Sequence, residues 1–440
     1  MKNDNYLIYF CILFIFFTPL KSSDNYDIKH LEPPFWWTQM SDTKLQLMVH
    51  GDNISELKPQ ISYPGVSIPA IHQVTNPNYL FIDILIDNNT IAGDFMIGFT
   101  KNDQIVLNHK YSLLERTPNS AMRNSFSPAD VIYLITADRF ANGDPENDST
   151  PNLKEKVNRK NKDGRHGGDI QGIIDHLDYI EEMGFTQLWL NPMLENNHAK
   201  YSYHGYSTTD YYNIDERFGG NTLYKLLSEE AHKRGIGIIK DIVLNHCGSE
   251  HWWMKDLPSK DWINNEGNYR QTSHNRVSLH DIHTTSSETS NFVDGWFVPT
   301  MPDLNHKNLF MSNYLIQNSI WWIEYANLSG FRIDTYPYHD KEFISEFGER
   351  LIDEYPNFNF VGEEWSLNPA IVSYWQKDSP RYDNYVSHTP SMMDFPLNSA
   401  LATSLQEKEN WNSGLILSLI HISAPTRRYA ISYAVFCLKK

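Results

Sequence analysis

The chain has 440 residues, enough for two or three domains, and its 40% hydrophobic and 21% charged residues are typical of a soluble globular protein. A formal charge of −17 argues against nucleic acid and anionic membrane surfaces as partners and suits a neutral ligand. The 12 Trp and 25 Tyr residues can build an aromatic core or stack on flat sugar rings.

The first element in chain order is an apolar stretch over residues 6–20, which follows Lys2 and precedes Lys21. A run of about 15 residues is short for a membrane span and has the length of a signal peptide, which we predict over residues 1–23. We therefore expect export to the periplasm or the medium, without stable membrane insertion after cleavage. An uncleaved anchor is the alternative.

Residues 24–118 have the pattern of an immunoglobulin-like β-sandwich. Short runs such as 45–49 and 79–85 alternate in polarity and are separated by Gly, Asn and Pro. Turn signals recur at intervals of roughly ten residues, as expected for such a domain.

Strands and helices alternate over residues 119–414. The expected strands cover 131–135, 186–190, 236–243, a segment ending at 334, a segment ending at 362, and 391–395, and the expected helices cover 171–183, 223–233, 313–326 and 341–354. This alternation predicts a parallel sheet in a barrel or a doubly wound fold. An insertion over 246–309 contains Trp252, Trp253, Trp262 and Trp296, and lining a sugar site and packing the insertion on the barrel are equally expected roles for these rings.

Two carboxylates stand where buried strands end. Asp334 and Glu363 each follow a short apolar run, and the predicted helix 341–354 separates them. A strand–helix–strand crossover places both acids on one rim of a parallel sheet. Two acids on one rim can cleave glycosidic bonds.

The neighbours of the two acids predict different protonation states. Arg332 precedes Asp334 by two residues, so both face the same side of a strand and the cation keeps the carboxylate charged. Glu363 has no basic neighbour in sequence and lies near Trp365, which favours the protonated acid. A purely structural Asp–Arg pair is the alternative.

Four motifs resemble one family in their order and spacing: 241–246, 301–305, 330–334 and 361–365. Over residues 33 to about 412 the chain resembles the α-amylase family, glycoside hydrolase family 13, and within it the neopullulanase and cyclomaltodextrinase group. The resemblance implies an α/β fold: a (β/α)8 TIM barrel, incomplete here with about six strands, a small domain inserted after the third strand, and a preceding β-sandwich.

The resemblance also implies residue roles. Asp334 would be the nucleophile and Glu363 the acid/base of a retaining mechanism. His246 would bind a sugar hydroxyl, Asp241 would support Arg332, and Tyr206 and His204 would stack on and hydrogen-bond the sugar. The segment 138–148 resembles a calcium loop, and the implied Ca²⁺ ligands are Asn142, Asp144, Asn147, Asp148, Gly167 and Asp169. A polar turn without metal is the alternative.

The implied activity is hydrolysis of α-1,4 or α-1,6 glucosidic bonds in maltodextrins, cyclodextrins or pullulan. The alternatives are a non-catalytic glucan-binding or transporter-associated relative and a transglycosylase of the same family. Relatives with this N-terminal domain often dimerise, so a homodimer is one expectation.

The C-terminal part departs from the family pattern. No Asn-His-Asp triplet follows Asp394, and residues 415–440 read as a non-native tail. Six strands cannot close an eight-stranded barrel. We therefore expect the 440-residue chain itself to be inactive and poorly soluble, whereas the intact gene would encode an active enzyme.

Overall fold

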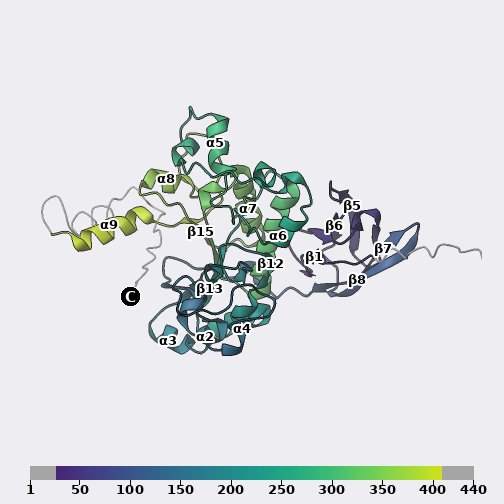
Figure 1. Ribbon diagram of the computed structural model, residues 1–440, viewed down its shortest axis with the longest axis horizontal. Helices are drawn as coiled ribbons and strands as arrows, with labels where there is room; N and C mark the ends of the chain where they lie inside the picture. Colours follow the sequence, from purple (N-terminus) through teal and green to yellow (C-terminus); the bar gives the residue numbers. More distant parts are fainter. Residues whose placement is uncertain (1–25, 409–440) are drawn as a thin grey trace, which may run out of the picture.

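The structure, a computed structural model, describes residues 26–408 (Figure 1). The predicted signal peptide and the predicted tail over 415–440 lie outside the described residues. Across the described range, no helix combines the length and the apolar character needed to span a bilayer.

The N-terminal region contains two four-stranded sheets, as the alternating runs predicted. One has the order β1 (His30–Glu32), β3 (Lys44–His50), β6 (Tyr79–Ile86), β5 (Val66–Gln73); the other has β2 (Trp36–Trp37), β8 (Gln104–Leu114), β7 (Gly93–Lys101), β4 (Lys58–Ile61). Leu47, Ile82 and Ile97 are fully buried in the core of this region. Burial of such apolar side chains is the main force that holds the sheets.

The second region is built on a six-stranded parallel sheet. Its order is β16 (Ser391–Met392), β15 (Phe360–Gly362), β14 (Gly330–Ile333), β13 (Gly237–Ile242), β10 (Gln187–Leu190), β9 (Ile132–Ile135). Each neighbouring pair is parallel. This sheet is the described part of the TIM barrel, and every residue of β10, β13 and β14 is buried, as expected for a parallel sheet that is covered on both faces.

Helices connect the strands. They are α1 (Ala137–Phe140), α2 (Ile170–Ile174), α3 (Leu177–Glu182), α4 (Gly220–His232), α5 (Ser286–Val293), α6 (Leu309–Ala326), α7 (Lys341–Glu354), α8 (Pro369–Tyr374) and α9 (Phe395–Gln406). A two-stranded ribbon, β11 (Leu194–Glu195) and β12 (Asp210–Ile214), lies between β10 and α4. Figure 1 shows α9 extending away from the rest of the molecule.

The helices predicted over 223–233 and 313–326 begin earlier, at Gly220 and Leu309, and two other predicted elements differ more strongly. The helix predicted over 171–183 is divided into α2 and α3, because His176 leaves the helical conformation with φ −113° and ψ 12°. The strand predicted over 391–395 ends at Met392. Asp394 caps α9 instead, accepting a hydrogen bond from the Leu397 amide at 2.9 Å, and Pro396 suits the first turn of that helix.

The tryptophans of the insertion pack rather than line a cleft. Trp253 and Trp262 are fully buried, and Trp296 is 4% exposed. The ring of Trp252 stacks on His30 of the N-terminal region at 3.9 Å. Of the two roles that the sequence left open, these contacts favour packing.

Candidate active site

Adjacent parallel strands deliver the candidate catalytic residues to one edge of the sheet. Asp241 is in β13, Arg332 is in β14, and Asp334 and Glu363 directly follow β14 and β15. The register pairs Asp241 with Arg332 and Ile333 with Gly362. All four side chains therefore emerge at neighbouring carboxyl ends, where active sites of barrels lie.

One guanidinium group joins three carboxylates. Nη1 of Arg332 donates to Oδ1 of Asp241 at 2.9 Å and to Oδ1 of Asp334 at 2.6 Å. Nη2 of Arg332 contacts Oε1 of Glu363. The four residues are between 1% and 7% exposed, so these ion pairs are poorly screened by solvent.

The contact with Glu363 corrects one expectation. The acid has no basic neighbour in sequence, but Arg332 reaches it across the sheet from the neighbouring strand. The direction of the effect on its pKa still agrees with the prediction. Burial raises the pKa of Glu363, Arg332 opposes this, and the charge on Asp334 adds to it.

Burial and charge act on the rest of the cluster as well. Burial raises the pKa of Asp241, although Arg332 stabilises its carboxylate. Burial disfavours charge on Arg332, but Asp241 and Asp334 outweigh it and raise the pKa of the guanidinium well above its usual value. Arg332 stays charged beside Asp334, which suits a carboxylate that acts as a nucleophile. Glu363 is biased toward its protonated form, which suits a proton donor.

Tyr206 and two histidines lie against this cluster. The hydroxyl of Tyr206 donates to Oδ2 of Asp241 at 3.0 Å. Nδ1 of His204 accepts from the Tyr206 amide at 2.9 Å, and Nε2 of His246 lies 3.0 Å from the Tyr206 carbonyl oxygen. Burial lowers the pKa of both histidines to about 4, so both are neutral at pH 7. Neutral imidazoles can donate to or accept from sugar hydroxyls.

Sequence reasoning missed two groups that hold the carboxylates. Nε1 of Trp189, at the end of β10, donates to Oδ2 of Asp241 at 3.0 Å. The Thr335 amide donates to Oε2 of Glu363 at 2.9 Å, from a residue with φ +47°. The one available signal for Trp189 was its position at the end of a buried strand.

Two further residues of the family motifs, Asn245 and Glu364, make polar contacts that hold the fold together. Asn245 donates from Nδ2 to Oδ1 of the buried Asp303 at 2.7 Å, which ties motif 241–246 to motif 301–305. Glu364 is buried and pairs with Arg276 at 2.7 Å. Neither contact places these side chains on the candidate acids Asp334 and Glu363.

A pocket of about 380 Å³ opens beside the cluster, a size that suits a small ligand. Its wall combines polar and aromatic side chains, as sugar sites require: Leu134, Thr136, Trp189, Asn191, Tyr206, Arg332, Glu363, Trp365, Met393, Asp394, Phe395 and Asn398. The proposed proton donor and Tyr206 therefore face a space that a ligand can enter.

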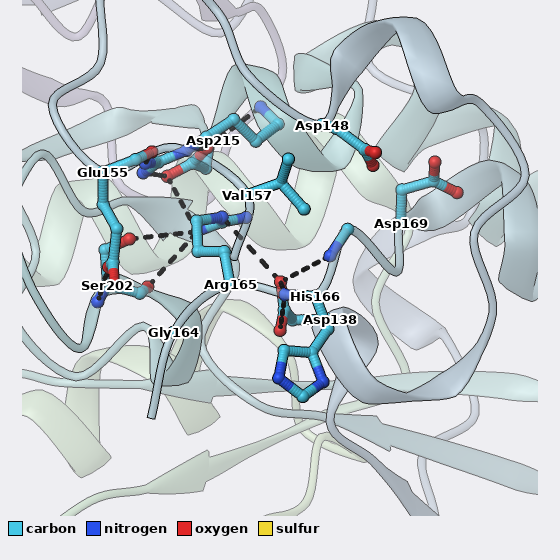
Figure 2. Close-up of polar contacts among 12 residues, drawn as sticks. Asp138, Asp148, Glu155, Val157, Gly164, Arg165, His166, Asp169, Ser202 and Asp215 are labelled. Atoms are coloured by element: carbon cyan, nitrogen blue, oxygen red, sulfur yellow. Dashed lines mark hydrogen bonds and ion pairs between the residues drawn. The ribbon is translucent and has the colours of Figure 1, made fainter. Parts of the chain in front are cut away.

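The implied calcium ligands also come together. Figure 2 shows Asp148 and Asp169 on the same side of the polar cluster around Arg165 and Asp138. Asn142 Nδ2 donates to Asp148 Oδ1 at 2.7 Å, whereas the Asp144 amide and Asn147 Nδ2 donate to Asp169 Oδ2 at 2.8 and 3.2 Å. A Cβ atom on Gly167 would lie 2.0 Å from Asp148 Oδ1, so the glycine lets the backbone approach this carboxylate.

The chemistry of this set fits a hard cation. Oδ1 of Asn147 is buried and has no hydrogen-bond partner among the described residues. Within residues 26–408, no group of three or more His, Cys, Asp and Glu side chains is arranged to hold a metal. A cation here would therefore need amide and backbone oxygens as well, which are the ligands that Ca²⁺ accepts.

Comparison with known proteins places this geometry in a family. Residues 134–419 match the family model of the alpha-amylase catalytic domain, which is well over half of the chain. The chain belongs to the alpha-amylase family. Residues 30–117 match the N-terminal domain of cyclomaltodextrinase, which agrees with the position of the two N-terminal sheets.

Individual members of the alpha-amylase family show similar sequences. Neopullulanase 2 from Thermoactinomyces vulgaris is 35% identical over 238 residues, which cover 53% of this chain and 38% of that protein. Intracellular maltogenic amylase from Bacillus subtilis (strain 168) is 32% identical over 237 residues, which cover 53% of this chain and 38% of that protein. The chain thus spans less than half the length of these curated relatives.

A solved structure of an alpha-amylase from Geobacillus thermoleovorans, complexed with acarbose, is 32% identical to this chain. Its TM-score is 0.52, and the match covers 65% of this chain and 55% of that one. The parallel sheet described above is therefore an alpha-amylase barrel sheet.

Proposed function

We propose that this alpha-amylase family member hydrolyses α-1,4-glucosidic bonds, and α-1,6 bonds as a variant specificity, in maltodextrins, cyclodextrins or pullulan. One observation carries the proposal: a single buried guanidinium contacts Asp334, Glu363 and Asp241 at the edge of a pocket. The names neopullulanase and maltogenic amylase among similar proteins support an α-glucan as substrate.

The proposed reaction is a double displacement with retention. Asp334 attacks the anomeric carbon while Glu363 donates its proton to the departing glycosidic oxygen, which leaves a glycosyl ester on Asp334. Glu363, now a carboxylate, removes a proton from water, and the water oxygen attacks the anomeric carbon and releases Asp334. Nδ1 of His246 has no partner among the described residues, and we assign it to a sugar hydroxyl. Tyr206 would stack on the same sugar.

Product analysis tests this function and separates it from the alternatives. The 440-residue chain and a version extended to the length of its family relatives are both assayed on maltoheptaose, β-cyclodextrin and pullulan. Hydrolysis predicts short maltooligosaccharides whose first-formed anomer is α. Products longer than the substrate indicate a transglycosylase, whereas binding without any cleavage indicates a glucan-binding relative and contradicts the proposal.

We also propose that the six oxygen-ligand residues around Asp148 and Asp169 hold a structural Ca²⁺. The ion would fasten the loop over 138–148 to Gly167 and Asp169. At free Ca²⁺ about 100-fold above Kd, the folded protein gains roughly 2.7 kcal/mol. Addition of a chelator should therefore lower Tm by a few degrees, and Ca²⁺ should restore it.

The substitution Asp148→Asn should remove most of this response, whereas Glu146→Gln, an exposed change in the same loop, should leave it intact. Differential scanning fluorimetry measures both variants without an activity assay. A wild-type Tm that changes neither with chelator nor with Ca²⁺ would show that the loop is a polar turn without metal.

Export and dimerisation remain proposals that rest on the sequence. We propose cleavage after the predicted signal peptide, with the mature protein in the periplasm or medium, and a homodimer through the N-terminal sheets. Cell fractionation with N-terminal sequencing tests the first, and it is discriminating because two similar proteins are named intracellular maltogenic amylase. Light scattering of the purified protein tests the second.

A further inference from the structure

Trp365 holds an unusual position at the pocket. Its side chain is 64% exposed, yet its indole Nε1 donates to Oε1 of Glu363 at 2.5 Å. The ring also packs on Phe395, the first residue of α9, at 5.0 Å and an interplanar angle of 30°. An exposed tryptophan is thus fixed at both its nitrogen and its ring face.

Glu363 receives hydrogen bonds from three donors. Arg332 and Trp365 both contact Oε1, and the Thr335 amide donates to Oε2. Arg332 is shared with Asp241 and Asp334, and the Thr335 donor is backbone. Among the side chains of residues 26–408 that donate to Glu363, Trp365 is therefore the one that does not also bind another carboxylate.

Other charged and titratable groups face Glu363 from the surrounding elements. Asp334 lies on the β14 side, Glu364 with its partner Arg276 follows in the chain, and Tyr338 lies in the turn after β14. All of these remain when the indole of Trp365 is replaced by a phenyl ring, which has no N–H donor. The contribution of Trp365 can thus be isolated by one conservative substitution.

We propose that Trp365 is a positioning residue for the proton donor, which fixes one oxygen of Glu363 and sets the pH at which this acid gives up its proton. The inference rests on the proposed role of Glu363. An indole N–H can only donate, and it binds a carboxylate more strongly than a neutral acid. The hydrogen bond therefore favours the charged form of Glu363 and opposes burial, so Trp365 acts in the opposite direction to the apolar neighbour expected from the sequence.

The first test is the pH dependence of kcat/KM in the active form found by product analysis. Trp365→Phe keeps an aromatic ring on Phe395 but removes the donor, so the alkaline limb on maltoheptaose should move upward by roughly 0.5–1 pH unit. Trp252→Phe is the matched control, because the indole nitrogen of Trp252 is buried without a partner in the described part of the chain. An unchanged limb in an active Trp365→Phe enzyme would overturn the inference and leave the proposed function standing.

A second test needs no activity and uses the 440-residue chain. A neutral carboxyl group quenches an adjacent indole more than a carboxylate does, so tryptophan emission should show a titration step from Trp365. Trp189 beside Asp241 can add a step common to all three proteins, so the step should be larger in the wild type than in both Glu363→Gln and Trp365→Phe. A wild-type step no larger than the step in the two variants would contradict the proposed contact. Absence of glucan cleavage would count against the proposed function alone.

Discussion

In the active form found by product analysis, replacement of Asp334 with Asn is expected to lower kcat on maltoheptaose by about four orders of magnitude or more, a size typical of the loss of a catalytic nucleophile. The amide is nearly isosteric with the carboxylate, but it cannot form the glycosyl ester. Asp334 touches the Arg332 guanidinium at 2.6 Å, so the variant also loses one ion pair beside the pocket. Initial rates of reducing-sugar release measure the effect.

The matched control is Asp353→Asn, the same chemical change at an exposed position of α7. It should retain wild-type rates. An Asp334→Asn enzyme with more than about a tenth of wild-type activity would exclude this residue as the nucleophile, since that loss is far below what removal of a nucleophile causes.

The second large effect concerns stability. Replacement of Arg332 with Met leaves Asp241, Asp334 and Glu363 buried without their shared cation. Removing one partner of a buried ion pair costs about 3–5 kcal/mol. We expect a loss of this size in the free energy of unfolding at pH 7, measured by urea denaturation.

The loss of folding free energy in Arg332→Met should be larger at pH 7 than at pH 5. Without Arg332, burial holds the pKa values of Asp241 and Glu363 further above their unfolded values of about 4. A raised pKa in the folded state contributes stability at low pH that is lost as pH rises through it. The Arg332→Met defect should therefore be largest at pH 7 and shrink toward pH 5.

Arg332→Lys separates charge from geometry. Lysine keeps a cation, but its compact ammonium cannot bridge three carboxylates as a planar guanidinium does. Its stability should lie between wild type and Arg332→Met. Equal stability of all three proteins at pH 7 would mean that the carboxylates are not dependent on this cation.

The backbone placement of the site was readable from the sequence. Asp334 and Glu363 each close an apolar run, and α7 has the bounds predicted for the intervening helix. These features are local, because a buried strand, an acid at its end and an amphipathic helix are each specified by a few neighbouring residues.

The contacts between strands were not readable. Arg332 reaches Glu363, and Trp189 reaches Asp241, because β10, β13, β14 and β15 pair in one particular register. Single-sequence patterns do not contain that register. The early end of β16 was different: Asp394 followed by Pro396 is a local helix-start signal that could have shortened the predicted strand.

In the proposed reaction, Asp334 forms a covalent bond to the sugar, whereas Glu363 donates and then accepts a proton. The most direct measurement uses Glu363→Gln with α-maltosyl fluoride, whose leaving group needs no acid. Without a base, the second step should stall, and mass spectrometry of proteolytic peptides should find a maltosyl ester on Asp334. An adduct on any other carboxylate, or rapid turnover to the β anomer without an adduct, would contradict the account.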